Sequence, residues 1–172
     1  MDIYEAITLR KSVRDFTDED VPEAAMNRIF EAARLAASAS NRQEWRFVAV
    51  RHKETRKKIA KAAMGQKHVA QAPVVLACCA ETDEHVMTCN QLSYPIDVAI
   101  AITHITLCAA AEGLGTCWIG AFSEVQIKEI LHIPPQIRVL AILPVGHPRD
   151  PSSVEKPRLP LTDIVKYEQW TP

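Results

Sequence analysis

The sequence has no surplus of charge of either sign. Its 172 residues include 20 lysines and arginines against 21 aspartates and glutamates, so the formal net charge is −1. A surface with this balance has no bulk electrostatic attraction for nucleic acid or for an anionic membrane. We therefore expect neither kind of partner.

A long uninterrupted apolar run is also missing. The first residues contain no apolar segment typical of a secretory signal. The longest apolar stretch, residues 96–111, is interrupted by Asp97, Thr103, His104 and Thr106 and is shorter than a membrane-spanning helix needs. The pattern predicts a helix buried inside the protein instead.

The sequence contains no C-x-x-C pair. Its five cysteines are an odd number, and without a leader they indicate free thiols in a reducing cytoplasm. Cys78 and Cys79 are adjacent in an apolar run, where strand alternation would direct them to opposite faces. His85 and Cys89 have the spacing of two metal ligands on one helical face, but no second pair accompanies them. Buried, inert thiols are the favoured interpretation and a metal site is the minor alternative.

The common nucleotide and hydrolase motifs are absent as well. There is no G-x-x-x-x-G-K-[ST] loop, and the GLG sequence at 113–115 lacks a third glycine and follows a helical pattern. These absences exclude an NAD-binding Rossmann domain and a nucleotide triphosphatase. No G-x-S-x-G elbow and no H-E-x-x-H motif is present either.

Helical and strand patterns follow one another without regular βαβ alternation, which favours the α+β class. No repeat or linker divides the chain, so we expect one domain over residues 1–172. Apolar spacing and capping residues predict helices over residues 3–9, 22–36, 53–64, 95–112 and 124–131. Runs rich in β-branched residues predict strands over 45–50, 73–80, 116–121 and 138–145.

Four cations are candidates for chemistry. Arg10 and Arg14 follow the first helix with Ser12 between them, and Lys156 and Arg158 lie in a proline-rich C-terminal tail. Each one alone would be an ordinary surface cation. Together they can converge on a phosphate, where arginine offers a bidentate fork and serine one further donor.

Asp97 and His104 lie seven residues apart, on one face of the apolar helix predicted over residues 95–112. One interpretation is an acid–base pair. The favoured interpretation is a pair of core polar residues, each satisfied by hydrogen bonds.

Four segments of the chain, taken together, resemble the FMN-dependent nitroreductase family. They occur in the family's order and cover nearly the whole chain: residues 10–16 (RKSVRDF), 38–45 (SASNRQEW), 113–120 (GLGTCWIG) and 156–158 (KPR). The family has prolines where this chain has Ala37 and Glu44. Since proline stiffens a loop, these two replacements leave the conformation of the second segment and the acceptor preference open.

The resemblance implies a three-layer α+β fold with a central, mostly antiparallel sheet flanked by helices. It also implies an intertwined homodimer with two FMN sites at the subunit interface, each lined by both chains. The C-terminal segment, residues 146–172, would reach the partner subunit. The apolar helix over 95–112 would form the dimer core, and its hydrophobicity independently suits an obligate interface.

By their positions in the matching motifs, residues from both ends of the chain are assigned to the phosphate and ribityl chain of FMN: Arg10, Ser12, Lys156 and Arg158, with Lys11 beside them. Arg14 would lie at the pyrimidine edge of the flavin, where a fixed cation favours the reduced, anionic ring.

The resemblance assigns small and polar residues from the middle of the chain to the flavin ring. Those bordering the ring and its polar edge are Ser38, Ala39, Asn41 and Gln43. Those near N5, where glycine allows close approach of the backbone, are Ile119, Gly120 and Ala121. Gln66 would touch the pyrimidine edge. No side chain is assigned as a catalytic acid or base.

The resemblance implies an NAD(P)H-dependent flavin oxidoreductase. NADPH or NADH would deliver hydride to flavin N5, and a small acceptor such as a nitroaromatic or a quinone would then take two electrons, in a ping-pong cycle. The short chain leaves little room for inserted lids, which favours a broad acceptor range. Alternatives within the family are action on enones or on halogenated aromatics. Alternatives outside it are a non-catalytic flavin-binding or redox-sensing protein and a phosphate-binding module without FMN.

Overall fold

The computed structural model describes residues 1–152 and 156–170 of the chain. Residues 153–155 and 171–172, part of the C-terminal segment expected to reach a partner, lie outside the described residues.

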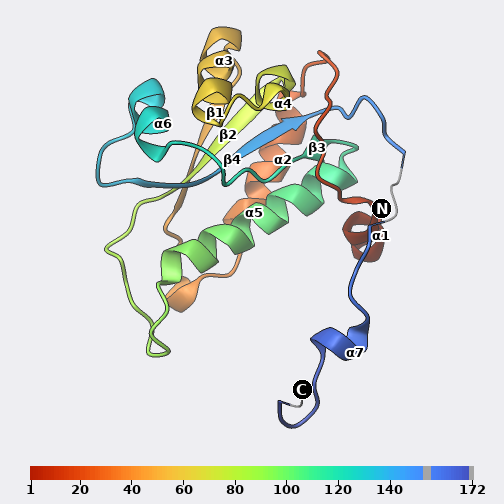
Figure 1. Ribbon diagram of the computed structural model, residues 1–172, viewed down its shortest axis with the longest axis vertical. Helices are drawn as coiled ribbons and strands as arrows, with labels where there is room; N and C mark the ends of the chain where they lie inside the picture. The colour runs from red at the N-terminus through yellow and green to blue at the C-terminus, as the bar shows by residue number, and fades with distance from the viewer. Residues whose placement is uncertain (153–155, 171–172) are drawn as a thin grey trace.

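A four-stranded antiparallel sheet forms the middle layer of the fold (Figure 1). The strand order is β1-β2-β4-β3, and every pairing between neighbours is antiparallel. All seven residues of β2 are buried, because helices cover both faces of the sheet. The strands are β1 (Trp45–Val50), β2 (Val74–Ala80), β3 (Gly115–Thr116) and β4 (Arg138–Gly146).

Helices form the two outer layers, so the expected three-layer α+β fold is confirmed. One face of the sheet is covered by α2 (Glu23–Arg34) and α5 (Ser93–Ala111). The other face is covered by α3 (Lys53–Ala62), α4 (Lys67–Gln71) and α6 (Glu124–Leu131). Three short helices lie outside these layers: α1 (Ile3–Leu9), the 3-10 turn η1 (Ala39–Asn41) and α7 (Leu161–Ile164).

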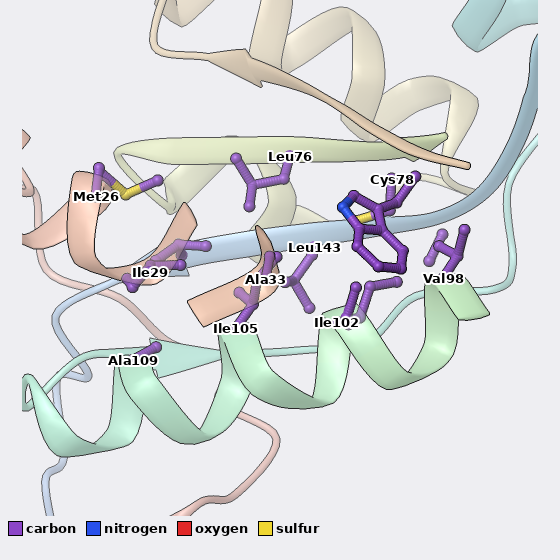
Figure 2. Packing of buried hydrophobic residues seen from close by; sticks show 14 of the residues in the cluster. Met26, Ile29, Ala33, Leu76, Cys78, Val98, Ile102, Ile105, Ala109 and Leu143 are labelled. Carbon is purple, nitrogen blue, oxygen red and sulfur yellow. The ribbon is translucent and has the colours of Figure 1, made fainter. Parts of the chain in front are cut away.

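The core beneath α2 and α5 is made of aliphatic side chains that meet across the layer (Figure 2). Ile29 of α2 and both Ile102 and Ile105 of α5 are fully buried against Leu76 of β2 and Leu143 of β4. Burying each such side chain contributes about 1.5–3 kcal/mol relative to leaving it exposed. This packing fixes α5 in place along its whole length.

The two adjacent cysteines of β2 point to opposite faces, as strand alternation predicted. Cys78 packs with α2 and α5, whereas Cys79 packs with α3, α4 and α6. Burial raises the pKa of Cys78 and raises that of Cys79 to about 11, so both are unreactive thiols. Residues 85–89 form no helix, so the spacing of His85 and Cys89 does not place them on one helical face.

Several predicted elements need correction. The strand predicted over 116–121 is only two residues long, and beyond it Ile119 alone pairs with Ile142 of β4. The helix predicted over 53–64 ends at Ala62, and α4 and α7 were not predicted. Helices of four or five residues are too short to show an apolar period, which explains both omissions.

By length and composition alone, the apolar helix α5 could cross a membrane. It packs against the sheet and α2, so it is a core helix with one uncovered side. Its early start at Ser93 leaves Pro95 in the first turn, where proline is tolerated.

Candidate functional site

The first motif begins where α1 ends. A capping box between Asp2 and Glu5 starts this helix, with both hydrogen bonds at 2.8 Å. The helix ends at Leu9, and the Arg10 N–H donates to the Ala6 carbonyl at 2.9 Å. The chain then continues in an extended form alongside the sheet, which carries Ser12 away from the helix axis.

A glycine joins the first motif to the third. The Val13 N–H donates to the Thr116 carbonyl at 2.9 Å, and Ser12 pairs with Thr116 as neighbouring parallel backbone. A Cβ atom on Gly115 would lie only 2.5 Å from Val13 Cγ2 and 2.8 Å from its Cβ. Only glycine therefore allows this approach, and GLGTC is brought beside RKSVR.

The C-terminal segment returns to the same place. The Thr17 N–H donates to the His147 carbonyl at 2.9 Å, and the Arg149 N–H donates to the Asp15 carbonyl at 3.1 Å. The Arg149 guanidinium also lies 3.2 Å from the Asp15 carboxylate. Residues 147–149 thus run beside residues 15–17.

Lysines hold the two ends of the chain together. Lys11 Nζ donates to the Asp150 carbonyl at 3.1 Å. Lys156 Nζ donates to the Thr8 carbonyl at 2.6 Å and also to the Arg10 carbonyl. Lys156 is therefore fixed at the C-terminal end of α1, where carbonyl oxygens point outward and a cation is stabilised.

The cations of this region crowd one another. Partial burial lowers the pKa of Lys156, and the charges of Arg10, Arg158 and Lys11 lower it further. Within residues 1–152 and 156–170, these four and Arg14 form no ion pair with a carboxylate. Like charges without a counter-charge are the arrangement that an anionic ligand stabilises.

Beside these cations lies a cavity of about 190 Å³. Its wall includes Arg10, the half-exposed indole of Trp118 and four hydroxyl-bearing residues. The hydroxyl-bearing residues are Ser12, Thr103, Thr106 and Thr116. Thr103 and Thr106 donate their hydroxyl hydrogens to carbonyls of α5, at 2.8 and 2.9 Å, so toward a ligand their oxygens can only accept. The Ser12 hydroxyl, which lies next to Arg10, can serve as a donor to a phosphate or a polyol.

The charge of Arg14 affects a second group of residues. Its charge, after the larger effect of burial, lowers the pKa of His68 on α4, and it opposes the rise that burial causes in the pKa of Cys117. His68 is therefore kept neutral at pH 7, and its Nε2 is buried without a hydrogen-bond partner in the described residues. This histidine was not predicted, because the five-residue helix α4 is too short to show an apolar period.

Gln66 and the segment after Trp118 contact each other in this chain. Gln66 Nε2 donates to the Ala63 carbonyl at 3.0 Å and to the Ala121 carbonyl at 3.4 Å. Gly120 is exposed, and a Cβ there would have no protein atom within 4 Å. Ile119, in contrast, is only 3% exposed, so its side chain belongs to the core.

The second motif lies elsewhere in the same chain. The Ala39 N–H donates to both carboxylate oxygens of Asp97, at 3.1 and 3.2 Å, near the start of α5. Figure 1 shows the loop between α2 and β1 at this end of α5 and α1 at the other. Asp97 and the cavity residue Thr106 are nine positions apart, about 14 Å along a helix. A single chain therefore does not bring residues 38–43 to the cation cluster.

The loop that carries the second motif is conformationally strained. Ser40, Asn41 and Gln43 have φ angles of 48°, 56° and 52°, which non-glycine residues rarely adopt. Each such residue costs on the order of 1–3 kcal/mol, and strain of this kind concentrates at functional sites. Within the loop, the Gln43 N–H donates to Ser38 Oγ at 3.1 Å.

Asp97 and His104 of α5 are structural anchors held by hydrogen bonds, in line with the favoured interpretation. Asp97 accepts from the loop at Ala39, and His104 Nδ1 lies 3.0 Å from the Ala32 carbonyl of α2. The positioning role of Asp97 was not predicted. The detectable sign of it was a carboxylate on an otherwise apolar helix.

Known proteins resemble this chain both in sequence and in fold. The model of the nitroreductase family matches residues 7–95 and 93–147. An NAD(P)H FMN reductase of Bacillus subtilis (strain 168) is 33% identical, over 98% of this chain and 74% of that protein. A nitroreductase family protein from Clostridium novyi NT is 34% identical, with a TM-score of 0.83 over 90% of this chain and 89% of that one.

The structure of an NADPH:FMN oxidoreductase from Vibrio harveyi in complex with NAD+ is also similar. Its TM-score is 0.89 at 29% identity, over 99% of this chain and 78% of that one. The family model, the identities and the shared architecture all cover most of the molecule. The chain therefore belongs to the nitroreductase family.

Proposed function

We propose that this protein is an FMN-dependent oxidoreductase that takes hydride from NADH or NADPH and passes two electrons to a small acceptor such as a nitroaromatic or a quinone. The observation that carries the proposal is the cluster of cations from both ends of the chain. Within the described residues these cations have no carboxylate partners, and one of them, Arg10, lines a cavity with hydroxyl-bearing residues in its wall. A phosphate ester on a polyol chain matches both features.

The residues of this cluster have different roles in binding the phosphate. Arg10 and Arg158 offer guanidinium forks to the phosphate and Ser12 offers a hydroxyl. Lys156 holds the C-terminal segment against α1 while adding its charge. Because the cations repel one another without an anion, binding of the phosphate relieves an unfavourable interaction that is already present.

A different part of the site faces the ring. FMN, when bound, supplies a ring nitrogen that accepts hydride and can return electrons as a pair. Arg14 provides a fixed positive charge for the pyrimidine edge, and the neutral His68 near it adds no further charge. Open space in front of Gly120 admits a flat ring, and Gln66 holds the carbonyl of Ala121 in place.

We also propose that the active form is a homodimer. The uncovered side of α5 carries residues at heptad spacing, none of them fully buried: Ile96, Ile100, Thr103, Leu107 and Ala110. This spacing suits packing against another helix. Exposed apolar residues also occur on α1 and on the C-terminal segment, including Tyr4 (78%), Leu161 (74%) and Trp170 (85%).

A two-fold axis through the middle of this stripe would complete the site. If two copies of α5 cross antiparallel near Thr103, Asp97 of one copy lies beside Ala109 of the other. Ala110 and Thr106 line a cavity together with Arg10 and Lys11. The loop over residues 38–43 of the second copy would then reach the cation cluster of the first, which unites the motifs that one chain keeps apart.

The free cysteines are typical of a reducing compartment, and NAD(P)H is available in such a compartment. All five are free thiols, and Cys78, Cys79 and Cys117 are buried. We propose a cytoplasmic protein, because free thiols persist in a reducing compartment.

Anaerobic mixing tests the proposal. Protein loaded with FMN should bleach rapidly on addition of NADH or NADPH and recolour when menadione or a nitrofuran is added. A flavoprotein that does not bleach would be a non-catalytic flavin-binding or redox-sensing protein. Protein that takes up no flavin on reconstitution would contradict the proposal altogether and favour a phosphate-binding module.

A further inference from the structure

The strained loop over residues 38–43 is tied to the rest of the protein at its entry, while its internal hydrogen bonds are those of a local turn, from the Asn41 and Arg42 N–H groups to the Ser38 and Ala39 carbonyls at 3.1 and 3.0 Å. Its entry is tied to α5 through Asp97. Inside the loop, the hydrogen bond between the Gln43 N–H and Ser38 Oγ is exposed to water. Positive φ angles at three non-glycine residues persist only where the surroundings fix them. The exit of the loop therefore needs an anchor as well.

A buried carboxylate lies at that exit. Glu44 directly follows the loop and is 5% exposed. Its Oε2 accepts a hydrogen bond from Ser93 Oγ at 3.2 Å, and its Oε1 lies 3.5 Å from the Arg42 guanidinium. Its backbone carbonyl accepts from the Glu81 N–H at 2.9 Å. A carboxylate is buried at high cost unless partners of this kind compensate it.

The partner Ser93 is the first residue of α5, the same helix that carries Asp97. The N-cap residue of α5, Leu92, has no side chain able to cap the helix. A negative charge beside the first turn interacts favourably with the positive end of the helix dipole. Glu44 thus stabilises the start of α5, and α5 in turn fixes the loop at both of its ends.

The second partner extends the anchor to another segment. Arg42 contacts Asp83 as well as Glu44, so it joins the loop to the segment between β2 and α5. The Ser93 N–H donates to the His85 carbonyl of that segment at 3.0 Å. Four side chains from three parts of the chain therefore meet around the exit of the loop.

We propose that Glu44 is a positioning residue of the flavin site, which fixes the loop over residues 38–43 through Ser93 and Arg42. The inference rests on the proposed function, because the loop matters for FMN only if the chain binds FMN. Glu44 touches neither FMN nor substrate in this account. It sets the geometry in which Ser38, Asn41 and Gln43 are presented.

The substitution Glu44→Gln tests the proposal, because it keeps the volume and the acceptor oxygen but removes the charge. We expect the dissociation constant for FMN, measured by quenching of flavin fluorescence, to rise about tenfold. At saturating FMN, the visible circular dichroism of the bound flavin should also change. Ser93→Ala should shift both in the same direction, and the double variant should bind FMN within twofold of Glu44→Gln alone.

A control variant that is destabilised to a similar extent distinguishes loss of loop positioning from a general loss of stability. Ile59→Val removes one methylene from a fully buried residue of α3, on the opposite face of the sheet. It should lower the melting temperature while keeping the wild-type affinity and dichroism. If Glu44→Gln does not fold, Ser93→Ala carries the same test.

The outcomes distinguish this inference from the proposed function. Wild-type protein that binds no FMN refutes the proposed function and leaves Glu44 no flavin site to position. Wild-type protein that binds FMN, together with variants that match it within twofold in affinity and dichroism, overturns the role of Glu44 alone. An equal loss of affinity in Ile59→Val would also overturn it, since the effect would then follow stability.

Discussion

Arg14 differs from the other cations of the site in what surrounds it. Beyond the larger effect of burial, the charges of Arg10, Lys11 and Arg158 lower the pKa of Lys156, whereas the charge of Arg14 lowers the pKa of His68. Arg14 and, to a smaller extent, Arg10 oppose the rise that burial causes in the pKa of Cys117. This difference supports the proposal that Arg14 serves the flavin ring while the other cations serve the phosphate.

Arg14→Ala should therefore slow flavin reduction more than it weakens flavin binding. We expect the anaerobic rate of bleaching by NADH to fall at least tenfold, because the negative charge of the reduced ring loses its fixed counter-charge. The dissociation constant for FMN should rise less than threefold. Arg34→Ala, which removes an exposed ion pair with Glu31 on α2, is the control and should change neither quantity. An unchanged bleaching rate in Arg14→Ala would disprove its assignment.

Single residues also show where sequence reasoning reaches its limit. The motifs predicted that both ends of the chain meet, and residues 12–13 do lie beside Thr116 and Lys156 beside α1. The second motif, over residues 38–43, lies apart from them within one chain. The motifs did not predict that the Ile119 side chain is part of the core, because the chain at this position is not a regular strand with alternating buried and exposed residues. Glu44 was noted only as a missing proline, since a buried role for a carboxylate depends on Ser93, 49 positions away.

At the scale of elements, α6 is joined to β4 by one carboxylate. Partial burial of Glu124 raises its pKa, but hydrogen bonds from the Arg138 guanidinium, the Val139 N–H and the Lys128 ammonium outweigh this and bring the pKa to about 2. Because the folded pKa lies below the usual value of 4.5, the ionised carboxylate stabilises the fold. That contribution is fully present above pH 4.5 and is lost as the pH falls toward 2.

Glu124→Gln should lower the free energy of unfolding by about 2 kcal/mol at pH 7, the usual contribution of hydrogen bonds to a charged group. The difference from wild type should shrink as the pH is lowered from 4.5 toward 2. Urea unfolding at pH 7 and pH 3 measures both values. A difference that stays constant between these two pH values would show that Glu124 does not titrate as described.

Elements with a strong period were predicted closely and irregular ones were not. The pattern gave β1 its observed bounds and placed α6 correctly. The strand expected over 116–121 is β-branched and apolar enough, but after Thr116 the chain leaves the β4 ladder and returns only at Ile119. Pairing geometry of this kind depends on β4, so no local pattern contains it.

At the scale of the whole molecule, the uncovered side of α5 should decide assembly. Ile96 is 43% exposed at one end of the heptad stripe. We expect the wild-type protein to have about twice the 19.2 kDa mass of one chain in light scattering. Ile96→Glu should give the monomer mass and lose FMN, because each site would lose the loop of the other copy.

Val125→Glu is the matched control, since Val125 is 66% exposed on α6, on the opposite face of the sheet. It should remain dimeric and keep FMN. A monomeric Ile96→Glu variant with wild-type affinity for FMN would contradict the shared site.

The central claim is that cations from the two ends of the chain hold one phosphate. Riboflavin lacks only that phosphate, so the comparison of FMN with riboflavin measures it directly. The account predicts that wild-type protein binds FMN at least 100-fold more tightly than riboflavin, and that Arg10→Ala and Arg158→Ala each reduce this ratio at least tenfold. Equal affinity of the wild-type protein for the two flavins would contradict it.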